Sequence, residues 1–287
     1  MTWAFFGTDE FSITVLETLK KEGLLPDLIV TVPDRPKGRK LIIAPPLAKV
    51  WAQENNLDFV QPESLKNLQE SEAQKITGQA FDFFLVASYG KIIPQTILDL
   101  PTKGTLNIHP SLLPQYRGST PIESAILNSE LQTGVTIMLV DAQMDHGPIL
   151  GQETIDLSGE ETSSVLANDL AQKGAILLAK ILPAWLEEKI TPVEQNHELA
   201  TFTKKIAKED GQINLEDSAI LNYRRYRAFQ PWPGVYTTIT HRQKSIRLNI
   251  KKARLAGELF IIERVTPEGK KEMSWEEFQR GIKNSSK

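Results

Sequence analysis

The 287-residue chain contains no cysteine, and this absence removes several classes of chemistry. Without thiols there is no disulfide framework, no thiolate metal site and no cysteine nucleophile. Histidine is also scarce, with four residues mostly scattered along the chain, so no metal site is predicted. The lack of disulfides fits a cytoplasmic protein.

Long hydrophobic runs are missing as well. No apolar stretch approaches the roughly 20 residues needed to span a bilayer. The first residues enter a strand-like run without the basic start of a signal peptide. Hydrophobic residues make up 40% and charged residues 24% of the chain, which is typical of soluble globular proteins. We therefore expect a cytoplasmic protein with no membrane association.

Charge is unevenly distributed, although the net charge is only -3. Residues 201–287 hold 18 Lys and Arg against 10 Asp and Glu, a net charge of +8. The preceding 200 residues keep the remaining 15 basic and 26 acidic residues, a net charge of -11. A basic C-terminal third on an acidic body indicates a polyanionic partner. A merely solvated basic surface is an equally open alternative.

The hydrophobic pattern of the first two thirds predicts alternating strands and helices. Strands are expected at 2–6, 28–32, 59–60, 81–87, 104–107, 134–140 and 149–155, and helices at 11–21, 44–54, 64–77, 120–128 and 162–188. Prolines at 33 and 36 favour a loop over 33–40. Short links between strand, helix and strand are typical of a mostly parallel, Rossmann-like α/β sheet.

A polar stretch without periodicity separates this region from a C-terminal part of different composition. We place an α/β domain at 1–188, a linker at 189–203 and a basic domain at 204–287. Strands are expected at 235–240, 245–250 and 259–264, followed by a helix at 274–280. This pattern predicts a small β-rich, barrel-like C-terminal domain.

The most informative motif is Asn107-Ile108-His109-Pro110-Ser111-Leu112-Leu113-Pro114, followed by Arg117-Gly118 and Asp145. If a strand ends here, Asn107 and His109 lie at its carboxyl end, where ligands bind in open α/β sheets. An amide for a developing oxyanion, an imidazole for proton transfer and a carboxylate to orient it suit acyl-type transfer. No protein nucleophile is needed if the substrate brings its own amine. Asp141 competes with Asp145 for the carboxylate role.

These residues and further motifs along nearly the whole chain resemble the folate-dependent formyltransferase family. The matching motifs are Asn-x-His-x-Ser-Leu-Leu-Pro at 107–114, Met-Asp-x-Gly at 144–147, Phe-Gly-Thr at 6–8 with Phe11, Asp-Arg-Pro-x-Gly-Arg at 34–39, Arg-Ala-Phe-x-Pro-Trp-Pro-Gly at 227–234 and Glu-Gly-Lys-Lys-x-Met-Ser at 268–274. The 34–39 and 268–274 motifs favour the methionyl-tRNA branch, whereas Pro-Trp-Pro-Gly is shared with sugar-nucleotide formyltransferases. The resemblance implies formyl transfer from 10-formyltetrahydrofolate to the α-amine of methionyl-tRNA. It also implies an OB-like C-terminal domain, which is shortened in this chain. We expect the protein to be a monomer.

The resemblance also implies roles for individual residues. Asn107 and protonated His109 would stabilise the oxyanion, and Asp145 would orient His109. The residues implied in folate binding are Ser111, Leu112, Leu113, Pro114, Tyr89 and Gly90. Those implied in substrate binding are Arg35, Lys37, Arg39 and Lys40 for the tRNA acceptor stem and Phe11 for the methionine side chain. Each has a structural alternative, such as a core histidine, a capping asparagine, a tight turn or a solvated charged face.

The chain departs from the family pattern at three places. Asp9 stands where proline is usual, His146 follows Asp145 where a small residue is usual, and the C-terminal domain is short enough to lack a strand pair. A sugar-nucleotide N-formyltransferase is the alternative enzyme, which the basic C-terminal third and the 34–40 loop disfavour. A non-catalytic folate- or tRNA-binding protein is the other alternative, which the intact Asn107, His109 and Asp145 disfavour.

Overall fold

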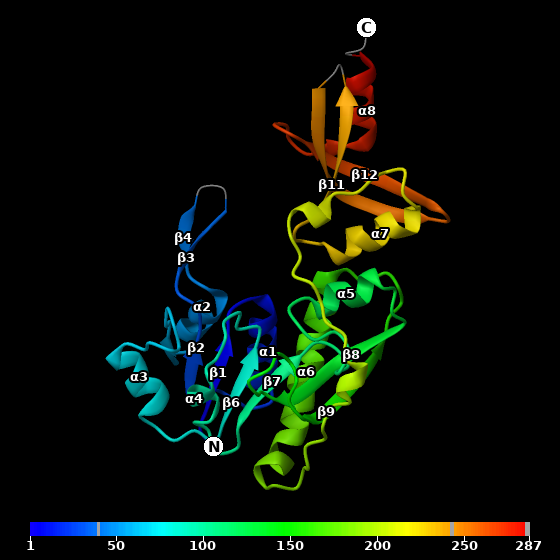
Figure 1. Ribbon diagram of the computed structural model, residues 1–287. Coiled ribbons are helices and arrows are strands. Elements are labelled where there is room, and N and C mark those ends of the chain that lie inside the picture. The colour runs from blue at the N-terminus through cyan, green and yellow to red at the C-terminus, as the bar shows by residue number, and fades with distance from the viewer. Residues whose placement is uncertain (39–40, 242–243, 285–287) are drawn as a thin grey trace. The chain divides into compact units, whose positions relative to one another are not determined.

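The computed structural model describes residues 1–38, 41–241 and 244–284 and divides the chain into two compact units (Figure 1). The first unit comprises Met1–Gly118, Thr133–Ile155 and Ala167–Phe202, and the second comprises Ser119–Gln132, Asp156–Leu166 and Thr203–Lys287. The expected linker at 189–203 thus packs with the first unit up to residue 202. Two earlier segments pack with the C-terminal part. Among the described residues, no helix is long and apolar enough to span a membrane.

The first unit is built on a seven-stranded sheet in the order β5-β2-β1-β6-β7-β8-β9. Its strands are β1 (Trp3–Gly7), β2 (Leu28–Val30), β5 (Asp58–Val60), β6 (Phe83–Ala87), β7 (Thr105–His109), β8 (Gln132–Leu139) and β9 (Ile149–Asp156). The strands from β5 to β7 pair in parallel, and β8 pairs antiparallel with β7. The predicted mostly parallel, Rossmann-like sheet is confirmed.

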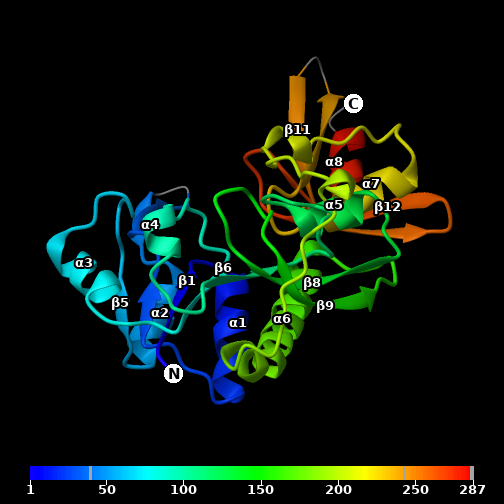
Figure 2. The ribbon, with the colours of Figure 1, turned by 60° about the horizontal axis from the view of Figure 1, so that its bottom comes forward.

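Helices cover this sheet, and its central strands are buried (Figure 2). The helices are α1 (Glu10–Lys21), α2 (Leu47–Glu54), α3 (Glu70–Thr77), α4 (Gln95–Leu98) and α6 (Ser163–Leu186), with a short 3-10 helix at His197–Leu199. Every residue of β1 is buried, which explains its uninterrupted apolar sequence, because a strand covered on both faces needs no polar alternation. The Thr14 hydroxyl lies 3.3 Å from Asn168 Oδ1, which joins α1 to α6.

The departure at Asp9 has a structural role at the start of α1. Asp9 is the N-cap: its Oδ1 accepts a hydrogen bond from the Ser12 N–H, and the Ser12 hydroxyl accepts one from the Asp9 N–H. This reciprocal pair is a capping box, which satisfies main-chain donors that a helix leaves open. Ser12 also donates to the Ala87 carbonyl at 2.7 Å, so the same residue fixes α1 against the end of β6.

The carboxyl ends of β1, β6 and β7 meet at one edge of the sheet. β2 pairs with one side of β1 and β6 with the other, so the strand order changes direction at β1. Ligands bind at such a switch point in open α/β sheets. The Thr8 hydroxyl donates to the Tyr89 carbonyl at 2.9 Å, which joins the loops after β1 and β6. His109, the last residue of β7, lies at this edge.

The expected loop over 33–40 is wrong in part. The chain forms a two-stranded hairpin there, with β3 (Arg35–Lys37) antiparallel to β4 (Ile42–Ala44). Proline is tolerated in β3 because both strands of a two-stranded sheet are edge strands. The expected helix at 64–77 is also too long, since α3 begins only at Glu70. Leu65 lies before α3 and is buried although it is not helical. The helix-like spacing of apolar residues at 64–69 therefore belongs to a loop that packs against the core.

In the part that the structure describes, the second unit combines an antiparallel sheet with helices. Its strands are β10 (Val235–His241), β11 (Lys244–Ala256), β12 (Leu259–Pro267) and β13 (Met273–Ser274), and its helices are α5 (Pro121–Leu127), α7 (Ala219–Ala228) and α8 (Trp275–Asn284), with a 3-10 turn at Glu209–Gly211. The sheet order is β10-β11-β12-β13, which confirms the β-rich prediction. The segment after β9 is tied in by Arg227, which donates to the Glu161 carbonyl at 3.1 Å, and by the Ser163 hydroxyl, which donates to the Gln230 carbonyl.

Candidate functional site

β7 presents Asn107 and His109 on one face of the sheet. Alternate residues of a strand share a face, so Ile108 points the other way. Ile108 lies against α6, where a side chain at Gly174 would come within 2.5 Å of its Cγ2. The close packing of α6 on that face keeps β7 in place behind the two polar residues. Asn107 is half-buried and sits in register with Val86 of β6 and Met138 of β8.

The His109 imidazole is buried, and each of its ring nitrogens faces a polar neighbour. Nε2 lies 3.0 Å from the Tyr116 carbonyl oxygen, which can only accept, so Nε2 carries a proton. Nδ1 lies 3.6 Å from Asp145 Oδ1, a distance for an ion pair but too long for a good hydrogen bond. Nδ1 is therefore the ring atom available to reacting groups, and the Asp145 carboxylate lies on the same side of the ring.

Asp145 reaches His109 from the loop between β8 and β9. Its φ is 50°, a left-handed conformation that non-glycine residues adopt at some cost. Its Oδ2 accepts a hydrogen bond from the Gly118 N–H at 2.7 Å, which leaves Oδ1 directed at His109. The structure thus brings Asp145 to the imidazole.

The alternative carboxylate, Asp141, is engaged elsewhere in the same loop. Asp141 Oδ2 lies 2.7 Å from His146 Nδ1, and its Oδ1 accepts the Gln143 N–H at 2.8 Å. The His146 ring stacks on His197, with centroids 4.0 Å apart and planes 6° apart. His146 therefore belongs to a local cluster with Asp141.

The turn after β7 is fixed by hydrogen bonds. The buried Ser111 hydroxyl donates to the Gln115 carbonyl at 2.6 Å. Leu113 donates its N–H to the Thr136 hydroxyl at 3.2 Å and accepts from the Gln152 amide at 2.9 Å. Its side chain is buried. Leu112 and Pro114 are half-buried, so the turn keeps some apolar surface accessible.

Of the remaining candidates, Tyr89 is mainly a core residue. Its ring is buried and meets Phe6 edge-on, with centroids 5.5 Å apart. Burial, followed by the charge of Glu72, raises the pKa of the Tyr89 hydroxyl above its usual range. The next residue, Gly90, has a φ of 79° and open space where a side chain would lie. Phe11 of α1 is half-buried.

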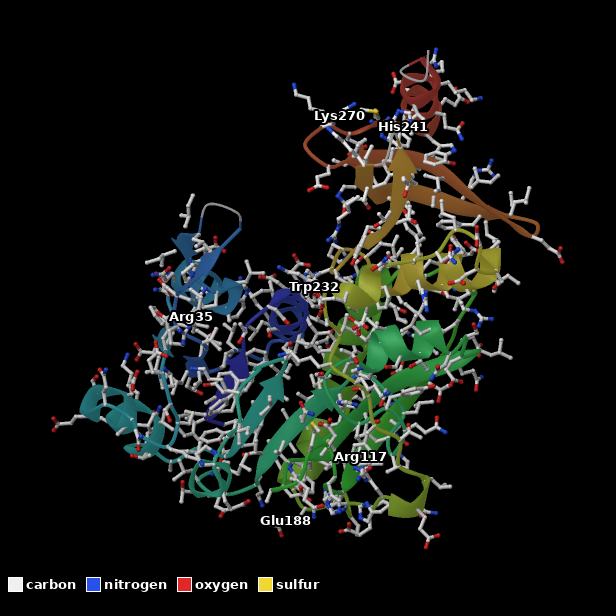
Figure 3. The ribbon with its side chains drawn as sticks, turned by 45° about the horizontal axis from the view of Figure 1, so that its top comes forward. Arg35, Arg117, Glu188, Trp232, His241 and Lys270 are labelled. Carbon is white, nitrogen blue, oxygen red and sulfur yellow. The ribbon has the colours of Figure 1, made fainter. Side chains whose placement is uncertain are left out.

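The basic residues expected to contact tRNA lie on the β3–β4 hairpin. Arg35 is exposed and pairs with Glu63 at 2.6 Å (Figure 3). The Lys37 side chain, Arg39 and Lys40 lie outside the described part of the structure. Apolar side chains of β4 are exposed, with Ile42 and Ile43 64% and 69% accessible. Within the described residues, no group of three or more His, Cys, Asp or Glu could hold a metal ion.

Sequence reasoning assigned no role to Tyr116, Gly118 or Gln195. Gly118 belongs to the Arg-Gly pair that follows the 107–114 motif, and this position could have indicated a role in the site. Gln195 lies in the stretch expected to be a linker, where no local pattern marks it. Its side-chain amide nevertheless donates to the carbonyls of Asp145 and Gly147, at 2.9 and 2.7 Å.

Two family descriptions match this chain. "Formyl transferase" matches residues 1–182, and "Formyl transferase, C-terminal domain" matches residues 205–259. The chain belongs to the formyl transferase family. The relative named methionyl-tRNA formyltransferase from Koribacter versatilis is 38% identical, and the match covers 100% of this chain and 97% of the relative. The relative of the same name from Halalkalibacterium halodurans is 33% identical, and the match covers 98% of this chain and 95% of the relative.

Solved structures of formyltransferases share the fold. Methionyl-tRNA formyltransferase from Clostridium thermocellum matches with a TM-score of 0.60 at 17% identity, covering 93% of this chain and 98% of its own. A 4-N formyltransferase from Francisella tularensis matches with a TM-score of 0.65 at 20% identity, covering 88% and 99%. At these identities the likeness establishes the fold of this formyltransferase and leaves its amine acceptor to other observations.

Proposed function

We propose that this formyltransferase transfers a formyl group from 10-formyltetrahydrofolate to the α-amine of methionyl-tRNA. The observation that carries the proposal is the position of His109 at the end of β7, 3.6 Å from Asp145 and on the same face as Asn107. The methionyl-tRNA acceptor is supported by relatives of that name that are 33% and 38% identical over nearly the whole chain. Solved sugar N-formyltransferases match in fold at 17% and 18% identity and the solved methionyl-tRNA formyltransferase at 17%, so the choice of acceptor rests on the more similar relatives.

10-Formyltetrahydrofolate supplies a formyl group bound to nitrogen, so negative charge develops on the formyl oxygen when the amine attacks. The donors at this edge fit such a substrate, because Asn107 offers a side-chain N–H and His109 offers Nδ1–H when protonated. One well-placed oxyanion donor typically contributes roughly 2.7–4 kcal/mol to transition-state stabilisation. We assign that role to Asn107 and His109 together.

Asp145 orients the imidazole and compensates its charge. With Nε2–H committed to Tyr116, the protonated ring keeps one N–H, at Nδ1, for the reacting groups, and Asp145 Oδ1 at 3.6 Å compensates the charge of the ring. The neutral amine forms a bond to the formyl carbon and loses a proton, and the folate nitrogen receives a proton as its own bond to that carbon breaks. Two routes fit the geometry: transfer from His109 Nδ1, or transfer through a water held by Asp145.

Folate contacts are proposed for the turn after β7 and the loop after β6. Leu112 and Pro114 are half-buried and offer a flat apolar wall, while Ser111 and Leu113 support it from within. The Tyr89 ring lies in the core, so we propose contact through its main chain and through Gly90, which has open space beside it.

Methionyl-tRNA is proposed to contact two basic regions. One is the β3–β4 hairpin with Arg35, Lys37, Arg39 and Lys40, and the other is the C-terminal third with its net charge of +8. Phe11 is proposed to contact the methionine side chain. We further propose that the protein acts as a monomer in the cytoplasm, where its substrates are found.

A transfer assay that offers 10-formyltetrahydrofolate with either methionyl-tRNA or an amino-sugar nucleotide tests the proposal. We expect formylation of methionyl-tRNA only. The His109→Ala variant is the control, and its kcat should fall roughly 10²–10⁴-fold while the KM for the folate changes little. Formylation of the sugar alone would establish the alternative acceptor, and transfer to neither would establish a binding protein.

A further inference from the structure

A segment of the chain outside the motif ties the two halves of the candidate site together. At one end, Val193 exchanges two main-chain hydrogen bonds of 2.8 Å with Ile149, the first residue after the loop that carries Asp145. At the other end, the Thr201 carbonyl accepts the Arg117 N–H at 2.8 Å, and the Thr201 hydroxyl accepts the Tyr116 N–H at 2.8 Å. Residues 193–201 therefore connect the Asp145 loop to the turn whose Tyr116 carbonyl holds His109.

Gln195 lies in the middle of this segment and is 5% exposed. Its Nε2 donates to the Asp145 carbonyl at 2.9 Å and to the Gly147 carbonyl at 2.7 Å. Its Oε1 accepts from Arg117 Nε at 3.2 Å and from Arg117 Nη2 at 2.6 Å. Both N–H groups and the oxygen of the amide are therefore used, and every bond goes to the Asp145 loop or to the turn beside His109.

Arg117 is buried without a counter-charge. It is 3% exposed, lies within the first unit (Figure 3), and has no carboxylate within ion-pair distance in the described part of the chain. Its other neighbours are His197 Nδ1 at 2.9 Å and the Phe202 ring, 5.9 Å from the guanidinium carbon. A buried cation is costly unless its N–H groups find acceptors. Gln195 and His197 supply them.

We propose that Gln195 and Arg117 form a clamp that positions Asp145. Gln195 holds the carbonyls on both sides of the turn, at Asp145 and Gly147, and so maintains the left-handed conformation of Asp145. In that conformation Oδ1 faces His109 while Oδ2 binds the Gly118 N–H, one residue after Arg117. Gln195 is thus a positioning residue that acts through Asp145. The inference rests on the role proposed for Asp145 in formyl transfer.

Only an amide of this length satisfies both sides of the clamp. Glutamate in its place keeps acceptors for Arg117 and adds a counter-charge, but it offers no donors to the two loop carbonyls. The Gln195→Glu variant should therefore fold normally while releasing the Asp145 loop. If Gln195 had only a structural role, kcat would fall only together with the thermal midpoint.

The experiment measures kcat, both KM values and the thermal midpoint of the Gln195→Glu variant. We expect kcat to fall at least about 30-fold, KM values within about threefold of wild type, and a midpoint no lower than that of wild type. Gln79→Glu is the control for the substitution itself, because the Gln79 amide also donates to a main-chain carbonyl, that of Lys75 at 3.3 Å, at an exposed position away from this loop. Its kcat should stay within about twofold.

A double-mutant cycle shows whether Gln195 acts through Asp145. In an Asp145→Asn background, Gln195→Glu should have little further effect on kcat, because the group it positions has already lost its charge. Independent, multiplicative losses would overturn the clamp. So would an unchanged kcat in the single variant.

An NMR readout separates failure of the clamp from failure of the proposed function. The His109 ring-nitrogen chemical shifts, assigned with His109→Asn, should change in Gln195→Glu in the same direction as in Asp145→Asn. This result with a wild-type protein that formylates neither acceptor would retain the clamp and reject the proposed function. Unchanged shifts would reject the clamp whatever the activity.

Discussion

At the residue scale, the position of His109 depends on the turn with Tyr116, the loop with Asp145 and the helix α6. Tyr116 fixes Nε2, Asp145 faces Nδ1, and Ile108 of β7 anchors the strand against α6. A buried imidazole held this way has one orientation, so its Nδ1 meets a substrate at a defined place. The geometry separates two carboxylates of the same loop, since Asp145 faces His109 and Asp141 binds His146.

The two loop carboxylates make a matched pair of variants. Asp145→Asn should lower kcat by roughly 10²–10⁴-fold, because an amide does not stabilise the protonated imidazole that donates to the oxyanion. Asp141→Asn removes a charge from the same loop but leaves the group that faces His109, so its kcat should stay within about threefold. Steady-state kinetics with methionyl-tRNA measure both. Equal losses in the two variants would assign the effect to the loop as a whole.

Tyr223 gives a pH-dependent contribution to stability in the second unit. Its hydroxyl donates to Glu160 at 2.6 Å, and burial, followed by Glu160, raises the pKa of Tyr223 to about 12. The folded protein then keeps this proton to a higher pH than the unfolded chain. The contribution to stability is therefore complete below the ordinary tyrosine pKa of roughly 10 and is lost as the pH rises toward the folded value.

The Tyr223→Phe variant tests that contribution. At pH 8 it should be less stable than wild type by about 0.5–1.5 kcal/mol, the usual net value of one hydrogen bond. By about pH 11 the difference should narrow, because wild type loses stability there and the variant does not. Urea unfolding at the two pH values measures the difference. A constant difference would mean that the hydroxyl is not protected by folding.

At the element scale, sequence reasoning found the buried strands and missed a hairpin made of edge strands. β1 and β6 were predicted from continuous apolar runs, which a strand buried on both faces requires. The β3–β4 hairpin was missed because two prolines in a short segment favour a loop, yet edge strands accommodate proline. The departure at Asp9 is explained by α1, whose first turn it caps.

Replacing the cap of α1 should lower stability by a predictable amount. Asp9→Ala removes the acceptor for the Ser12 N–H and for the Ser88 hydroxyl, which lies 2.5 Å from Asp9 Oδ2. The free energy of unfolding should fall by about 1 kcal/mol, the typical effect of losing an N-cap side chain. Asp9→Asn keeps an acceptor oxygen and should lose much less. Denaturant unfolding compares the two, and equal losses would argue against capping.

At the scale of the whole molecule, the second unit is discontinuous in sequence. Residues 119–132 pack with the C-terminal part through α5, which contacts α7, and residues 156–166 do so through the Tyr223–Glu160 and Arg227–Glu161 hydrogen bonds. The C-terminal part is therefore not a simple appendage to a catalytic domain. Its basic charge is also partly neutralised, since Arg225 pairs with Asp217, and Lys252 and Arg254 both pair with Glu263.

Truncation should consequently damage more than tRNA binding. A chain that ends at Phe202 lacks α7 and leaves the segments 119–132 and 156–166 without their partners. We expect a lower thermal midpoint and increased binding of a hydrophobic dye, because buried apolar surface of α5 becomes exposed. Calorimetry and dye fluorescence measure both. A truncated protein as stable as the full chain would show that the first unit folds alone.

Point variants test the basic C-terminal third without this damage. Arg224 and Lys251 have no ion pair among the described residues, whereas Lys252 and Arg254 share Glu263. Replacing Arg224 and Lys251 with alanine should weaken methionyl-tRNA binding and reduce the slope of log K against log salt by about 1–2. The Lys252 and Arg254 double variant is the control and should change the slope less. Filter binding at several salt concentrations distinguishes them, and equal slopes would argue against phosphate contacts at Arg224 and Lys251.

The sequence by itself determined the mostly parallel sheet, the β-rich C-terminal part and the place of Asn107 and His109 at a strand end. These features depend on hydrophobic periodicity and on one short motif, both of which are local. The Met-Asp-x-Gly motif favoured Asp145 over Asp141, but only the tertiary structure shows that Asp145 faces His109 and that Gln195 holds the Asp145 loop. Those contacts join segments far apart in the chain, and their geometry depends on how loops after different strands meet at one edge of the sheet. No local pattern carries that information.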